Sequence, residues 1–312
     1  MMVRVSGGTS TALGLSRGRL DAPLRTGYFM TYSTMPGGKC LADCSFCTLA
    51  SSSSSSSDFL SRVKWTPYPM EAVVRALEER GSAFRRACLQ VVNYPGFLQD
   101  TFAFLDSLAG RLPISVSVMP LGKENFSRLK GKGADRIAVP MDAATPALFE
   151  KHKGRRGFYT WERHAASMRQ ALEVFGRGNV FTYLIVGLGE SDEEALRFMA
   201  DFKDMGAVVA LHSFTAVPGL DIVGAHTPTI ARYRGIQLAR HLIFEKGASL
   251  RNFEFKDGAL DRIVGFPDLA AVIRSEEPYL TTGCPDCSRP FYTERANGPL
   301  YNVPALRSEG AP

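Results

Sequence analysis

The sequence predicts an α/β fold with a parallel sheet, arranged as a β/α barrel. Strand-like runs alternate with helix-like runs along most of the chain, and no internal repeat is visible. The length of 312 residues suffices for one β/α barrel or two smaller domains. Hydrophobic residues make up 45% and charged residues 22% of the chain, as is ordinary for a globular protein with a large core.

The alternation begins with a strand-like run at 28–33, followed by helical spacing at 70–80 that ends at Gly81. Residues 87–92 predict a second strand, because the turn residues 93–96 stop it. The later elements are helix 97–112, strands 114–118 and 136–139, helix 161–175, strand 180–186, helix 192–202, strand 207–214 and helix 230–244, with 251–255 as a further strand. We therefore expect six β/α units, and one or two more.

The organisation expected from composition is a barrel over residues 28–277, preceded by an N-terminal extension, 1–27. Residues 278–312 form a tail rich in Gly, Pro and turn residues. The serine run at 51–57 cannot pack a core, so we expect a mobile loop without a role, with a lid over substrate as the alternative. No signal peptide or membrane span of roughly 18 apolar residues is visible, and we expect a cytoplasmic protein.

The net charge of +6 favours an acidic partner, which could be nucleic acid, an anionic membrane or an acidic protein domain. The charge is spread along the chain in short clusters such as residues 151–156, so a solvated basic surface is an equally good interpretation. The six cysteines fall into close-spaced groups, which in a cytosolic chain indicate metal or redox chemistry more than disulfides.

Cys40, Cys44 and Cys47 have the spacing C-x3-C-x2-C, in a loop on the active-site face of a β/α barrel. Three thiolates can bind three irons of a [4Fe–4S] cube, which leaves the fourth iron open, as a catalytic metal site requires. A structural zinc site would need a fourth ligand nearby, and a cluster for electron transfer alone would normally have four cysteines. Phe46 can shield the cluster or contact a bound nucleoside.

With its flanking residues, the loop from Gly37 to Cys47 resembles the signature loop of the radical S-adenosylmethionine (SAM) superfamily. The resemblance implies a radical SAM β/α barrel, partial or full, and a [4Fe–4S] cluster whose open iron is chelated by SAM. In that family, reductive cleavage of SAM gives methionine and a 5′-deoxyadenosyl radical, which abstracts hydrogen from an unactivated C–H bond. The cofactor carries this chemistry, while the protein positions the reactants and excludes water.

The same resemblance assigns further residues to SAM. Asn93 stands where the family has a Gly-rich motif near the SAM amino group, and the sequence departs from that motif. Ile185, Gly187 and Glu190 match the I-x-G-x-x-E element beside the adenine, and the glycine also suits a tight strand-to-helix turn. Asp142 is placed like a ribose-binding carboxylate of the biotin synthase branch, with a helix N-cap as the alternative.

The tail carries Cys284 and Cys287 as C-x2-C, which fits half of a zinc site, half of a cluster or a redox pair. Cys88 either points into the barrel or is a small buried hydrophobe. Its position matches a cysteine of the auxiliary cluster in biotin synthase. The resemblance therefore implies an auxiliary iron–sulfur cluster on these three cysteines, with Ser288, Arg251 or nothing as the fourth ligand.

Residues 28–282 are similar to biotin synthase-like proteins, whereas residues 60–65 and 283–295 resemble the archaeal-type, two-component lipoyl synthases. That likeness implies sulfur insertion into an octanoyl chain carried on a lysine of an acidic lipoyl carrier domain. A sulfide of the auxiliary cluster, held beside the carbon radical, would be the sulfur donor. It also implies a partner synthase component and an electron donor such as ferredoxin or flavodoxin.

Three other functions stay open. Biotin synthase, or another sulfur insertion into a small molecule, is disfavoured because Ser115, Ser117 and Phe181 replace cluster cysteines. A radical SAM methylthiotransferase acting on RNA would suit the charge, but no appended RNA-binding domain is visible and nucleic acid is not expected. A non-catalytic zinc or iron–sulfur scaffold would neither bind nor cleave SAM.

Overall fold

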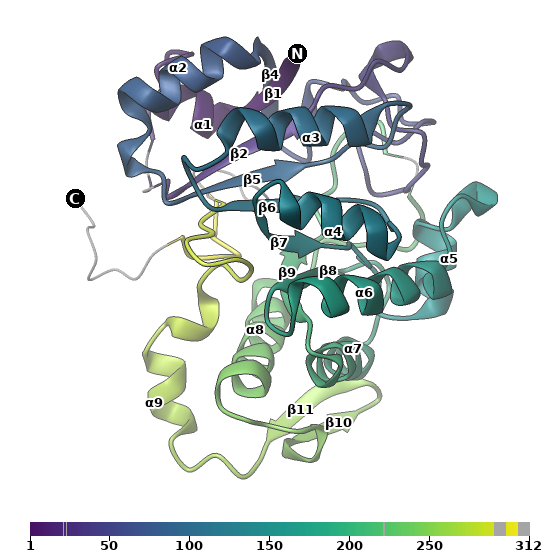
Figure 1. Ribbon diagram of the computed structural model, residues 1–312. Coiled ribbons are helices and arrows are strands. Elements are labelled where there is room, and N and C mark those ends of the chain that lie inside the picture. Colours follow the sequence, from purple (N-terminus) through teal and green to yellow (C-terminus); the bar gives the residue numbers. More distant parts are fainter. Residues whose placement is uncertain (21, 23, 221, 290–297, 305–312) are drawn as a thin grey trace.

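A computed structural model of the chain describes residues 1–20, 22, 24–220, 222–289 and 298–304. Its centre is a nine-stranded sheet in the order β3-β4-β1-β2-β5-β6-β7-β8-β9 (Figure 1). The strands that pair in parallel are β2 (Thr26–Thr31), β5 (Arg86–Gln90), β6 (Ile114–Ser117), β7 (Ala134–Ala138), β8 (Val180–Val186) and β9 (Val208–Ser213). Because β3 and β9 end the sheet without meeting, the predicted β/α barrel is confirmed in its partial form.

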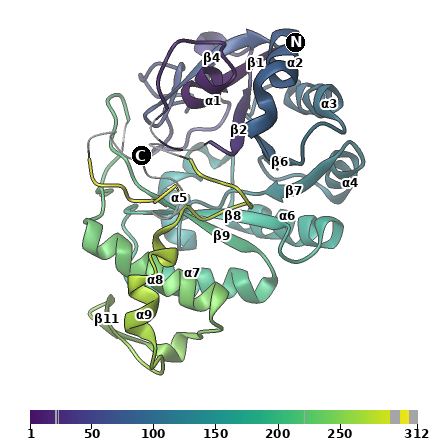
Figure 2. The same ribbon diagram turned by 90° about the vertical axis from the view of Figure 1, so that its left-hand side faces the viewer.

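Helices follow the parallel strands and cover the outside of the sheet, and Figure 2 shows α2, α3, α4 and α6 along one side. They are α2 (Met70–Arg80), α3 (Phe97–Leu108), α4 (Lys123–Gly131), α5 (Pro146–His152), α6 (Trp161–Phe175), α7 (Asp192–Met205) and α8 (Ile230–Glu245). The sequence did not predict α4 or α5, because each has too few turns for helical periodicity to be recognised. Within the described part of the chain, no helix has the length and apolar character to cross a membrane.

Residues 1–27, expected as an extension, contribute β1 (Met2–Ser6) and α1 (Gly7–Ala12) to the fold. β1 pairs antiparallel with β2 and with β4 (Val63–Pro69), and β3 (Phe59–Leu60) completes this edge. Val3 and Val5 are buried, and so is Arg4, whose guanidinium donates to the carbonyl oxygen of Trp65 at 3.1 Å. A buried arginine in a five-residue strand explains why the sequence pattern did not reveal this element.

The strand expected at 251–255 lies outside the main sheet. A 3-10 turn at Leu250–Asn252 is followed by β10 (Phe253–Lys256) and β11 (Ala259–Ile263), which form a separate antiparallel hairpin. After α9 (Leu269–Arg274), the tail returns to the barrel, and Figure 1 shows it in yellow at the opposite edge of the sheet from the loop after β2. The strand type was right, but its pairing depends on contacts that are distant in sequence.

Candidate active site

The cysteines of the C-x3-C-x2-C motif lie in the loop after β2, at the carboxyl edge of the parallel strands. Within this loop, the Cys40 amide donates to Leu49 O at 2.8 Å and the Cys47 amide to Cys44 O at 3.0 Å. All three side chains line one cavity of about 300 Å³. Burial raises the pKa of each thiol, that of Cys47 to about 12, so metal binding must displace their protons.

Two other segments hold the cysteine loop. The Leu41 amide donates to Asn93 O and the Ser45 amide to His152 O, both at 2.8 Å. The His152 ring also bridges Ser45 Oγ, at 3.0 Å, and Leu188 O, at 2.8 Å. Because a carbonyl only accepts, Nε2 carries the proton and Nδ1 accepts from the serine hydroxyl. Burial lowers the pKa of His152, so the neutral ring connects the cysteine loop to the turn after β8.

The serine run at 51–57 is hydrogen-bonded to other segments through Ser52 and Ser55, whereas its composition predicts a mobile loop. Asp43 Oδ1 accepts from the Ser52 amide at 3.0 Å and from its hydroxyl at 2.5 Å. The Ser55 hydroxyl donates to Pro218 O at 2.5 Å, and Lys39 Nζ donates to Ser55 O at 2.6 Å. The run therefore connects the cysteine loop to the loop that follows β9.

Four residues assigned to SAM by resemblance line the cavity beside the cysteines, and they are Phe46, Asn93, Asp142 and Ile185. Gly187 and Glu190 do not line it. Asp142 adopts a left-handed conformation with φ of 70°, which aspartate tolerates better than most residues. Its alternative role as an N-cap is not filled, because Thr145 caps α5 through its side chain.

Sequence reasoning missed Lys153, which also lines the cavity. Its ammonium pairs with the carboxylate of Asp142 at 2.6 Å, and the two side chains are only 6% and 10% exposed. The ammonium also donates to Pro140 O and lies 5.7 Å from the ring centroid of Tyr159. In the sequence it belongs to the basic cluster 151–156, for which a solvated surface and a surface for an acidic partner are equally good interpretations. The buried ion pair places two opposite charges beside the cysteine loop.

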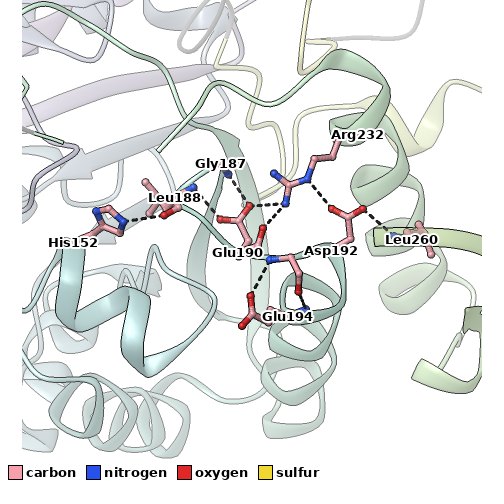
Figure 3. A network of polar contacts seen from close by, with 9 residues as sticks. His152, Gly187, Leu188, Glu190, Asp192, Glu194, Arg232 and Leu260 are labelled. Carbon is pink, nitrogen blue, oxygen red and sulfur yellow. Dashed lines mark hydrogen bonds and ion pairs between the residues drawn. The ribbon is translucent and has the colours of Figure 1, made fainter. Parts of the chain in front are cut away.

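Glu190 shapes the turn after β8 (Figure 3). Its carboxylate accepts from the amides of Gly187 and Leu188 at 2.7 and 2.9 Å, and Arg232 donates to it at 3.0 Å. Arg232 also pairs with Asp192 at 2.7 Å. With all these contacts, Glu190 fixes the backbone at the end of β8.

Gly187 satisfies the conformational role that its sequence context predicts. Its φ is 110°, and a Cβ atom there would lie 2.2 Å from the carbonyl oxygen of His226. That distance is far below any van der Waals contact, so glycine alone fits the turn. Ile185, two residues earlier, is thereby held with its side chain at the cavity.

The second group of cysteines lines the same cavity from the other end. Cys88 faces the lumen, as strand alternation predicts for a residue that shares a face with Gln90. The tail meets the amino edge of the strands, where Thr26 Oγ1 donates to Asp286 O at 2.7 Å. Burial raises the pKa of Cys88, and that of Cys284 to about 11. The fold therefore brings Cys284 and Cys287 to Cys88 across almost two hundred residues.

The donor set suits iron–sulfur clusters. Among the described residues, no three His, Cys, Asp or Glu side chains converge as ligands of one metal ion would. In a [4Fe–4S] cube each thiolate binds its own iron, so cysteines need not converge on one point. The thiols that line this cavity provide the soft ligands that iron–sulfur clusters use.

Neither residue considered as a fourth ligand lines the cavity. Arg251 is exposed in the 3-10 turn Leu250–Asn252, and Ser288 is buried beside the lumen. Two arginines that sequence reasoning missed, Arg86 and Arg289, line the cavity at the tail end. Residues 290–295 of the tail, which contribute to the resemblance, lie outside the described residues.

The comparison with protein families gives a match to the radical SAM superfamily over residues 34–202. The matched region is more than half of the chain and contains the cysteine loop, Asp142 and the turn after β8. No match was found among the curated proteins.

Several solved structures have a similar fold. Methylornithine synthase (PylB) superposes with a TM-score of 0.53 at 14% identity, over 76% of this chain and 65% of that protein. HydG, a maturase of the [FeFe]-hydrogenase, gives 0.55 at 15% identity, over 76% and 52%. SuiB of Streptococcus suis gives 0.51 at 14% identity, over 74% and 48%. The chain thus spans about half to two thirds of these proteins, and likeness at such identity establishes the fold alone.

Proposed function

The chain belongs to the radical SAM superfamily, and from that premise we propose that it is a lipoyl synthase component. It inserts sulfur into the octanoyl chain of an octanoyl-lysyl carrier domain. Cys40, Cys44 and Cys47 hold the [4Fe–4S] cluster that the family uses with SAM. Cys88, Cys284 and Cys287 hold the auxiliary iron–sulfur cluster that donates sulfur.

One observation carries this proposal: both groups of cysteines line a single cavity, one at each edge of the parallel strands. A radical formed at the first edge can therefore act on a substrate that reaches the second without leaving the cavity. Holding the radical and the sulfur source in one cavity makes capture of the carbon radical effectively unimolecular.

The wall between the two edges suits a hydrocarbon chain. Apolar side chains from strands β2 and β8 face the cavity, including Met30, Phe181 and Ile185. An octanoyl chain gains free energy by leaving water for such a wall, at about 0.8 kcal/mol for each buried CH₂ group. A polar small molecule would gain little from the same surroundings, so the wall favours an acyl substrate.

When bound by Cys40, Cys44 and Cys47, the first cluster with SAM would supply a hydrogen-abstracting radical, and a second cluster on Cys88, Cys284 and Cys287 would supply sulfur together with irons able to accept an electron. Cys40, Cys44 and Cys47 must lose their protons when they bind the first cluster, because thiolates are its ligands. Lys153 and Asp142 orient SAM from the side of the cysteine loop, and Ile185 contacts its adenine. The apolar wall excludes water, which protects a reactive radical from side reactions.

The partners follow from the same proposal. A carrier domain bearing octanoyl-lysine docks at the cavity mouth, and its acidic surface complements the net charge of +6. A second synthase component installs the other sulfur, and a ferredoxin or flavodoxin supplies the electron for SAM cleavage.

The first test counts iron and sulfide in the anaerobically purified full chain and in a Cys40/Cys44/Cys47→Ala variant. Two cubane clusters predict about eight irons in the wild type and about four in the variant. Almost no iron in the variant would leave a single cluster and remove the basis for sulfur insertion.

The second test mixes the reduced protein and SAM with an octanoylated carrier domain, and follows sulfur incorporation by mass spectrometry. A thiolated octanoyl-lysine is expected. SAM cleavage without any thiolated carrier, with or without a partner component, would contradict the substrate assignment.

A further inference from the structure

The sulfurs of Cys88 and of the two tail cysteines, Cys284 and Cys287, each contact one polar side chain of the barrel lumen. These side chains come from three neighbouring strands, β2, β5 and β6. The pairs are Gln90 Nε2 with Cys88 Sγ at 3.2 Å, Ser115 Oγ with Cys284 Sγ at 3.1 Å, and Tyr28 Oη with Cys287 Sγ at 3.5 Å.

Tyr28 must be the donor in its pair. Its phenolic oxygen accepts two backbone hydrogen bonds, from the amide of Ser288 at 3.1 Å and from the amide of Arg289 at 2.9 Å. These donors occupy the acceptor sites of the oxygen, so the phenolic hydrogen is left for the third neighbour, Cys287 Sγ. The tail backbone therefore sets the direction of the O–H···S hydrogen bond.

Ser115 is oriented in the same way by a charged neighbour. Arg86 Nη1 donates to Ser115 Oγ at 2.9 Å, which leaves the serine hydrogen to point at Cys284 Sγ. Arg86 is 6% exposed and is fixed by two hydrogen bonds to Asp135, at 2.6 and 2.8 Å. A buried guanidinium thus polarises the hydroxyl that donates to the sulfur.

Gln90 supplies the third donor from the strand that carries Cys88 itself. The two residues are separated by one position in β5, so both face the lumen. The amide NH₂ group of Gln90 can only donate, so Cys88 Sγ is the acceptor in this pair. The sulfurs of Cys88, Cys284 and Cys287 are therefore all acceptors, which is the arrangement that stabilises negative charge on sulfur.

We propose that Tyr28, Ser115 and Gln90 form a hydrogen-bonding shell that sets the reduction potential of the iron–sulfur centre on Cys88, Cys284 and Cys287. This inference rests on the proposed function, since it requires that centre. Hydrogen bonds to cluster sulfurs withdraw electron density and favour the reduced, more negative state. The shell therefore raises the potential and lets the irons accept an electron when the C–S bond forms.

The test is an EPR-monitored redox titration of the reconstituted full chain. The EPR signal that persists in the Cys40→Ala variant belongs to the centre on Cys88, Cys284 and Cys287 (the tail centre). Gln90→Leu removes one donor while keeping a side chain of similar size, and Ser115→Ala removes another. The midpoint potential of the tail centre should shift downward in each single variant and further in the double variant.

Ser117→Ala is the matched control. Ser117 lines the same cavity and pairs with Gln90 across β5 and β6, but donates to no cysteine that the structure describes. The midpoint potential of the iron–sulfur centre in the Ser117→Ala variant should stay at the wild-type value. If Gln90→Leu and Ser115→Ala retain two clusters and leave the potential unchanged, the shell is overturned while the proposed function stands. If the wild type holds only one cluster, both are overturned.

Discussion

The Nδ1 atom of His152 lies 3.0 Å from the hydroxyl oxygen of Ser45, the residue that follows Cys44. Through this contact the last residue of α5 holds the loop that carries the first three cysteines. The other ring nitrogen reaches Leu188 O at 2.8 Å, in the turn that Glu190 shapes. One neutral imidazole thus joins the cysteine loop to the end of β8.

Replacing that imidazole should loosen the loop. His152→Ala leaves the Ser45 hydroxyl and the Leu188 carbonyl without their shared hydrogen-bond partner. Each buried polar group left unpaired lowers the free energy of unfolding by about 1–3 kcal/mol. Urea unfolding of the apo protein should show this loss, and iron should leave the first cluster faster in the presence of a chelator. His226→Ala is the control, because His226 is exposed, and it should unfold like the wild type. Equal stability of the two variants would contradict the role of His152.

The stability of the apo protein should fall as the pH drops below about 6.5. Burial lowers the pKa of His152, His212 and His241, and that of His164 to about 2. The unfolded state therefore binds more protons than the folded state below the ordinary histidine pKa, and stability is lost as the pH falls. Each such histidine contributes up to about 1.4 kcal/mol per pH unit. Urea unfolding between pH 5 and 8 would measure the slope, and a His164→Phe variant that folds should have a shallower one.

Removing the lysine of the buried ion pair between Lys153 and Asp142 should lower the free energy of unfolding more than removing the lysine of an exposed pair. Lys153→Met leaves a buried carboxylate unpaired and should destabilise the protein by about 3–5 kcal/mol. The double variant Asp142→Asn/Lys153→Met should recover much of that loss. Lys123, whose pair with Glu173 is more than half exposed, is the control, and Lys123→Met should cost less than about 1 kcal/mol. A double variant no more stable than Lys153→Met would argue against a direct pairing.

Gly187→Ala should be far more costly than an equivalent change at another glycine with positive φ. An added Cβ meets the carbonyl oxygen of His226 at 2.2 Å, so backbone must shift in addition to the strain of φ. Gly178 has φ of 79° and nothing within 4 Å of its Cβ position, so Gly178→Ala carries only the conformational cost, about 1 kcal/mol. We expect the melting temperature of Gly187→Ala to be clearly lower. Matching melting temperatures would mean that the turn relaxes around the methyl group.

Substitutions in the two groups of cysteines should affect different steps of the reaction. Cys40→Ala should abolish SAM cleavage, because the first cluster loses a ligand. Cys284→Ala should keep SAM cleavage and lose sulfur insertion. Chromatography of 5′-deoxyadenosine and mass spectrometry of the carrier domain measure the two steps. Full product formation by Cys284→Ala would rule out the tail centre as sulfur donor.

The sequence predicts the features of this fold that depend on neighbouring residues, but not those that depend on contacts between distant segments. Patterns over a few residues were readable: the alternation of strands and helices, the C-x3-C-x2-C loop and the glycine turn after β8 all depend on neighbours in sequence. The missed strand β1, the hairpin β10–β11 and the burial of Lys153 depend on contacts with distant segments. The roles assigned to Asp142, Ile185 and Glu190 in SAM binding stay predictions.

The sequence by itself determined that the chain forms β/α units and carries three cysteines spaced for a cluster with an open iron, because backbone periodicity and ligand spacing are local properties. Only the tertiary structure decided that Cys284 and Cys287 meet Cys88 in the lumen, and that Tyr28, Ser115 and Gln90 donate to the three sulfurs. The contacts of Ser115 and Tyr28 with the tail sulfurs arise because the tail closes the amino edge of the barrel, whereas the Gln90–Cys88 contact lies within β5. No local pattern encodes that closure, since it depends on packing between segments far apart in the chain.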